Sequence, residues 1–163
     1  EEEIFRTVKK IQEAGIRVIG NFIFGLPDED RQSMGETLRM ALDLDLDFAN
    51  FYSAMAYPGS KLYDLALQKG WQLPELWQDF SQHSVGTLPL PTEHMSAGEV
   101  LSFRDNAWRE YFTSERYLSH VRRKFGPEVV SHLNSVAAKQ LTRKHGAKPP
   151  ALALPGAAPA LLR

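Results

Sequence analysis

The turn Gly25-Leu26-Pro27-Asp28-Glu29 is the most informative segment for chemistry. It follows an apolar run that reads as a buried parallel strand, and α/β folds bind ligands at the carboxyl ends of such strands. A glycine there allows a ligand to approach the backbone, and the amino end of the next helix offers free N–H groups. A turn required only for packing explains the same residues, and spacing alone favours that simpler interpretation.

A second turn, Tyr57-Pro58-Gly59-Ser60, follows the next predicted strand. Carboxyl ends of parallel strands meet at one edge of a sheet, so both turns are expected to open on the same side. The simpler interpretation is an ordinary turn in which Ser60 caps the following helix.

Histidines and aspartates are weaker candidates. His83 and His94 have no carboxylate or histidine at ligand spacing, so we expect solvated or packing roles rather than metal binding or acid–base catalysis. Asp43, Asp45 and Asp47 cross a helix–strand junction, which favours a solvated turn over a cation site.

A basic stretch covers residues 116–148 and could contact phosphates, RNA or an acidic partner. No aromatic residues alternate with these charges to stack on bases, so the solvated face of two helices is the favoured interpretation. Its charges are Arg116, Arg122, Arg123, Lys124, Lys139, Arg143 and Lys144, opposed chiefly by Glu128.

Periodicity in the first seventy residues predicts alternating helices and strands. We expect a helix over 2–14, a strand over 16–24, a helix capped by Asp28 or Asp30 that runs to about 44, a strand over 48–56 and a short helix that ends at Gly70. This order implies parallel strands, with the first covered on both faces. Two strands are too few for a stable sheet, so others must come from upstream sequence or another chain.

The second half of the chain has a different organisation. Residues 71–95 form a long loop, in which Trp71, Trp77 and Phe80 are expected to pin the loop rather than close over a substrate. Residues 96–145 read as a helical extension that opens with the capping box Ser96-to-Glu99 and includes helices over 114–125 and 127–144. Residues 146–163 are expected to be disordered.

Composition narrows the protein class. The 163 residues are 43% hydrophobic and 24% charged, which is a globular balance, and the net charge of −1 argues against nucleic-acid binding by charge alone. No cysteine is present, so a disulfide, a thiolate metal site and a cysteine nucleophile are excluded. No membrane-length apolar run or signal peptide is seen, so we expect a cytoplasmic protein. The lack of an initial methionine suggests a fragment.

Four tracts carry a family resemblance. "GIRVIGNFIFGLPDED" and "DFANFYSAMAYPGSKLYDLALQKGW" resemble the last strand–helix units of a radical SAM barrel, and "PLPTEHMSAGEVLSFRDNAWREYF" and "RYLSHVRRKFG" resemble a C-terminal extension. The resemblance covers nearly everything but the tail. It is strongest to the branch with an N-terminal cobalamin-binding domain, which includes anaerobic magnesium-protoporphyrin ester cyclases and many methyltransferases.

The resemblance implies an α/β fold: the C-terminal part of a partial (β/α)6 barrel followed by helices. That family cleaves S-adenosylmethionine (SAM) reductively with a 4Fe–4S cluster held by a CxxxCxxC motif, and cobalamin, where present, carries a methyl group. Its fifth-strand motif, loosely GxIxGxxE, maps onto Asn21, Ile23, Gly25 and Asp28, with Asn21 in place of a glycine and Asp28 or Glu29 in place of the acid. Backbone from Ile23 through Phe24 to Leu26 is expected to contact the adenosine, and relatives more often read GLPGE at this turn.

Three hypotheses follow. The first is the C-terminal portion of a radical SAM enzyme acting on a small molecule, with the cluster and cobalamin ligands elsewhere in the intact protein, so that this chain alone is not competent. The second is a cluster-free half-barrel that serves as a docking module. The third is a barrel end from another enzyme class that binds phosphate at Gly25 and Gly59.

Overall fold

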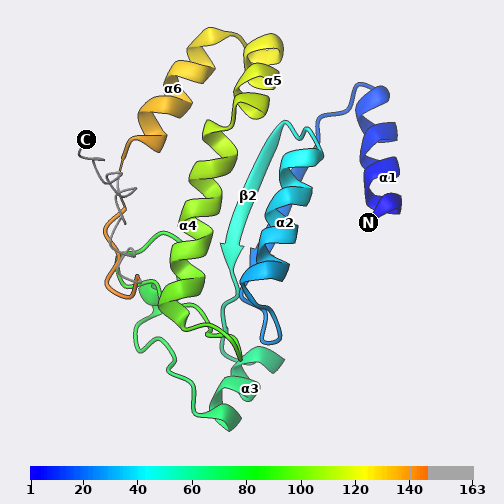
Figure 1. The fold of residues 1–163 in the computed structure, drawn as a ribbon. Coiled ribbons are helices and arrows are strands. Elements are labelled where there is room, and N and C mark those ends of the chain that lie inside the picture. The colour runs from blue at the N-terminus through cyan, green and yellow to red at the C-terminus, as the bar shows by residue number, and fades with distance from the viewer. Residues whose placement is uncertain (140, 147–163) are drawn as a thin grey trace, which may run out of the picture.

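A computed structural model describes residues 1–139 and 141–146; apart from Gly146, the tail expected to be disordered lies outside them. The elements alternate as helix–strand–helix–strand–helix before a helical second half (Figure 1). Their bounds are α1 Glu2–Glu13, β1 Ile19–Phe24, α2 Arg31–Asp43, β2 Phe48–Ser53, α3 Lys61–Lys69, the 3₁₀ turn η1 Trp77–Phe80, α4 Ala97–Thr113, α5 Glu115–Phe125 and α6 Pro127–Ala137.

Within the described residues, β1 and β2 form a two-stranded parallel sheet. The register runs from the pair Ile19–Phe48 to the pair Phe24–Ser53. The predicted strands and their parallel pairing are thereby confirmed, and the fold is mixed α/β. That this sheet belongs to a partial (β/α)6 barrel remains a prediction.

Only one face of this sheet is covered. Phe22, Phe24 and Phe51 point into the core, where α2 and α4 pack on the sheet (Figure 1). The opposite face of β1 is open, with Ile19 58% and Ile23 48% exposed. The expectation that the first strand is covered on both faces was therefore wrong for this chain, because no element of the described residues lies against that face.

The two edges of the sheet also differ. Phe24 O accepts a hydrogen bond from Ala54 N (2.7 Å). In this parallel register the N–H and C=O groups of every second residue of β1 point toward β2, and the N–H and C=O groups of Asn21 and Ile23 point away from it. On the outer edge of β2, the Gln82 carboxamide pairs with both backbone groups of Ser53, at 2.9 Å each. A side chain thus closes the end of β2, whereas no strand of the described residues pairs with the outer edge of β1.

An aromatic stack fills the covered side. Phe51 stacks on Phe22 and Phe24 with centroids 5.5 and 5.8 Å apart, and Tyr111 of α4 meets Phe51 edge-on at 5.4 Å. Phe103 closes on Phe24 at 5.1 Å. Offset and edge-to-face pairs of this kind add to the free energy of burial, so the stack fixes α4 across both strands.

Polar caps set the helix boundaries. Asp30 caps α2 in a capping box with Ser33, so Asp28 is not the cap. Ser60 caps α3 and Ser96 caps α4, as predicted. The last helix was predicted to reach residue 144 but ends at Ala137, and beyond it Arg143 and Lys144 form hydrogen bonds with the loop after η1 instead of continuing the helix.

The aspartates before β2 bind the basic helix α5. The guanidinium of Arg116 pairs with Asp43 at 3.0 Å and with Asp45 at 2.7 Å. Lys124 forms an ion pair with Asp47. The expectation of a solvated turn therefore holds for the exposed Asp43 and Asp45 and was wrong for Asp47, which is only 8% exposed.

Asp47 joins three parts of the fold. Its carboxylate accepts from Val18 N at 3.1 Å, and His120 Nε2 lies 3.3 Å from the other oxygen. Tyr117 donates to its backbone oxygen at 3.1 Å, and burial raises the pKa of Tyr117 to about 12. Burial alone would raise the pKa of Asp47, but hydrogen bonds from Lys124, Val18 and His120 outweigh that effect and lower it.

We predict that Asp47→Asn lowers the free energy of unfolding by ~2 kcal/mol at pH 7. Because the folded-state pKa is depressed, the carboxylate stabilises the fold above its unfolded pKa of about 3.9, and this contribution is lost as pH falls through the folded value. Urea unfolding at pH 7 and pH 3 measures it. Asp43→Asn is the control: Asp43 is exposed and also pairs with a basic side chain of α5, and its substitution should lower the free energy of unfolding by under about 1 kcal/mol. An Asp47→Asn effect of equal size at both pH values contradicts the prediction.

Candidate functional site

The carboxyl ends of β1 and β2 meet the segment that leads into α4. Glu93 N donates to Pro27 O and Leu90 N donates to Ala54 O, each at 2.9 Å. This segment therefore crosses the ends of both strands, close to α3 and the start of α4 (Figure 1). The edge where α/β folds bind ligands is bordered here by two turns and one long loop.

The first turn is closed by its own acid. Gly25 N and Leu26 N both donate to the same oxygen of Glu29, at 2.8 Å each. Glu29 is thus the acid that organises the turn, and Asp28 is exposed with no hydrogen bond or ion pair of its carboxylate in the described part of the chain. The two N–H groups expected to be free for a ligand already have a partner.

Packing against α4 accounts for the glycine in this turn. Gly25 is buried with φ +85°, a conformation that favours glycine, and a Cβ atom at this position would overlap the side chain of Val100. The space beside the glycine is therefore occupied by α4. The packing interpretation explains the residue without a ligand.

The structure separates the predicted site residues into two groups. Asn21, Ile23 and Leu26 are exposed, with Asn21 and Ile23 on the open face of the sheet. Phe24 is fully buried in the aromatic stack, so its side chain faces the opposite way. Their role in binding SAM remains a prediction.

An amide pair lies on the open face. Asn50 Nδ2 donates to Asn21 Oδ1 at 2.9 Å, directly across the two strands. Each carboxamide keeps further donor or acceptor capacity, because an amide group can form more than one hydrogen bond. With Ile23 and the half-buried Tyr52 beside it, this face combines apolar surface with a few polar groups, as small-molecule sites do.

The second turn and the aromatic residues of the loop lie together. Tyr57 stacks on Phe80 with centroids 5.9 Å apart, and its hydroxyl is 3.4 Å from Phe80 O. Phe80 is buried, which agrees with a pinning role, whereas Trp77 is 78% exposed and contacts the Phe80 ring, with centroids 5.7 Å apart. Trp71 packs on the small cluster around Leu90.

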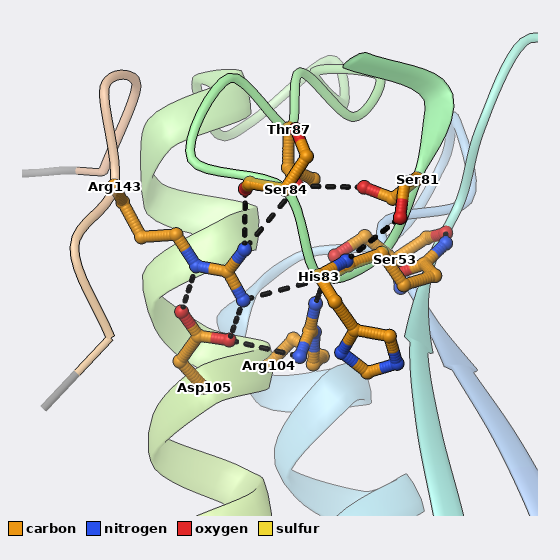
Figure 2. A network of polar contacts seen from close by, with 9 residues as sticks. Ser53, Ser81, His83, Ser84, Thr87, Arg104, Asp105 and Arg143 are labelled. Carbon is orange, nitrogen blue, oxygen red and sulfur yellow. Dashed lines mark hydrogen bonds and ion pairs between the residues drawn. The ribbon is translucent and has the colours of Figure 1, made fainter. Parts of the chain in front are cut away.

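A buried polar network, not identified from the sequence, holds the loop after η1 (Figure 2). Arg143 binds Asp105 through two hydrogen bonds of 2.8 and 3.0 Å, and it also donates to Ser84 O at 2.9 Å. Arg104 pairs with the same Asp105 at 2.9 Å and donates to the carbonyl of Gln82. One signal was present in the sequence: Arg104 lies on the apolar stripe of its helix, at the spacing of buried residues.

His83 and His94, the two histidines considered from the sequence, are both exposed, as expected. Partial burial lowers the pKa of His83, and the nearby charges of Arg104 and Arg143 lower it further while Asp105 opposes them. His83 is therefore neutral at pH 7, beside the buried arginines (Figure 2).

Metal ligands are not assembled in the described residues: no group of three histidine or acidic side chains there could hold an ion. The sequence has no cysteine, so this chain does not fit a 4Fe–4S cluster held by thiolates. No helix of the described segments is long and apolar enough to cross a membrane.

Comparison with known proteins supports a relationship to radical SAM proteins. The chain is 35% identical over 74 residues to an uncharacterised methyltransferase of Pyrococcus horikoshii, covering 45% of this chain and 16% of that protein. It is 27% identical over 119 residues to an anaerobic magnesium-protoporphyrin IX monomethyl ester cyclase of Rubrivivax gelatinosus, covering 73% of this chain and 20% of the relative. The chain is 28% identical over 105 residues to the same kind of cyclase from Cereibacter sphaeroides, covering 64% of this chain and 16% of the relative.

The matched regions thus span a fifth or less of each of these relatives. No family model matches the chain.

We predict that Gly25→Ala destabilises the chain by ~2 kcal/mol, because the new methyl group must displace Val100 and the backbone must keep a positive φ. Gly35→Ala is the matched control: it lies inside α2 with nothing within 4 Å of the new Cβ, and it should stabilise by ~0.5 kcal/mol. Thermal or urea unfolding of both variants provides the measurement. Equal stability of the two would show that Gly25 is not needed for packing.

Proposed function

We propose that this chain is the C-terminal portion of a radical SAM enzyme and that the open sheet face contacts SAM. The observation that carries the proposal is the pairing of a covered aromatic face with an open face that ends at the turn Gly25 to Glu29. The relatives named methyltransferase and cyclase support the same class of chemistry.

The open face fits the adenosine part of SAM through its side chains. Ile23 and Leu26, 48% and 43% exposed, offer apolar surface on which an adenine ring can lie. The Asn21–Asn50 pair lies two residues back from Ile23 on the same face and offers amide groups to polar edges. Because Glu29 already binds Gly25 N and Leu26 N, the backbone carbonyls and these side chains carry the proposed contacts.

The cofactors divide between this chain and the rest of the intact protein. A 4Fe–4S cluster would supply the electron that cleaves SAM, and its cysteines must lie outside this chain. Cobalamin would likewise be bound by another domain. The residues of this chain position the adenosine on the open face of the sheet.

The outer edge of β1 could accept the further strands that a barrel requires. The outward N–H and C=O groups of Asn21 and Ile23 form an edge that a parallel strand can join, whereas on the outer edge of β2 the Gln82 side chain occupies only the end, at Ser53. Helix α1 has no fully buried residue: Phe5 and Val8 pack partly against the core, whereas Ile4 is 47% exposed. We propose that the preceding barrel half of the same polypeptide covers the edge of β1 and the exposed part of α1.

A docking module is the second candidate, favoured by the open edge of β1 and by the lack of cysteine. In that case another chain supplies the added strand, and this chain needs no affinity for SAM. SAM binding therefore separates the two candidates.

We predict that the full-length protein carrying this chain binds SAM and that Ile23→Asp weakens binding at least about tenfold, because a carboxylate would be buried against the adenine. Ile19→Asp is the control: the residue lies on the same open face, about 13 Å away at the other end of β1. It should change affinity less than about twofold. Isothermal titration with and without a reconstituted cluster measures both variants.

Absence of SAM binding under both conditions overturns the proposal. Equal losses in Ile23→Asp and Ile19→Asp would place the adenosine elsewhere.

A further inference from the structure

Two buried polar atoms, one at the carboxyl end of β2 and one on α4, have no partner among the described residues. Ser53 and Arg104 are 2% and 3% exposed, yet Ser53 Oγ and Arg104 Nε make no hydrogen bond within the described residues. Buried polar groups are nearly always paired, so two orphans in one region need an explanation. Arg104 Nε can only donate a proton, and the Ser53 hydroxyl can donate or accept one, so an acceptor is the group that would satisfy both.

These two donors belong to one corner of the fold. Gln82 contacts both residues: its carboxamide pairs with the Ser53 backbone, and its carbonyl accepts from Arg104. The exposed His83 follows it and lies beside Arg104 (Figure 2). The corner is therefore close to solvent, at the strand end where α/β folds bind ligands.

The charges of this corner do not balance. The two guanidinium groups of Arg104 and Arg143 share the single carboxylate of Asp105, and His83 is neutral at pH 7. One positive charge remains in excess among these groups. Burial and Arg143 lower the pKa of Arg104, whereas Asp105 raises it, which agrees with an incompletely compensated cation. A buried charge without a full partner is costly.

We propose that this corner binds a carboxylate group of a small-molecule ligand. The carboxylate oxygens accept hydrogen bonds from Ser53 Oγ and Arg104 Nε. The ligand approaches past His83, whose neutral ring adds no charge. A carboxylate supplies the missing negative charge and two acceptor oxygens for the two orphan donors. The inference does not depend on SAM binding, because these donors lie on the covered side of the sheet.

The test is a titration of the whole 163-residue chain with sodium acetate, in which the NMR signal of Arg104 Nε–H is the readout. The reference is sodium chloride at equal ionic strength. Acetate should shift this signal saturably, whereas the signal of Arg143 Nε–H, already bonded to Asp105, should stay in place. Ser53→Ala should weaken acetate binding about tenfold through loss of one charge-assisted hydrogen bond.

Arg116→Gln is the matched control, because this exposed arginine already pairs with Asp43 and Asp45 and should leave acetate binding unchanged. An equal response to acetate and chloride overturns the proposal. Unchanged affinity in Ser53→Ala overturns it as well, and this variant removes only a hydroxyl, so it is expected to fold. Neither result bears on SAM binding, which is measured separately.

Discussion

The packing of Phe24 and Phe51 against α4 is the contact on which the rest of the structure depends. It joins both strands to one helix and buries one face of the sheet. With this side filled by α2 and α4, the other face of β1 and its outer edge have no covering element among the described residues. The arrangement leaves Asn21 and Ile23 available to a ligand or a further strand.

Ion pairs fix the helical second half at both ends of the sheet. At the amino end, Asp47 receives hydrogen bonds from the backbone before β1 and from α5. At the carboxyl end, Arg143 and Arg104 hold the loop after η1, and Lys144 N donates to Val85 O at 2.8 Å. The extension therefore supports the strand ends rather than forming a separate unit.

Local signals in the sequence predicted the elements well, because caps and periodicity act over a few residues. Ser60, Ser96 and Gly126 end or begin helices as expected. Long-range pairing was missed: the predicted basic face of α5 is partly neutralised by aspartates about seventy residues earlier. The turn at Gly25 was located correctly, but its reason is contact with Val100, which only the fold brings near.

Hydrogen exchange at the outer edge of β1 tests the central claim, that the open sheet is completed by the rest of a longer polypeptide. The amides of Asn21 and Ile23 face away from β2. The account predicts rapid exchange of both in the 163-residue chain and strong protection in the full-length protein, while the amide of Ala54, bonded to Phe24, is protected in both. Equally rapid exchange of Asn21 and Ile23 in the two proteins would contradict it.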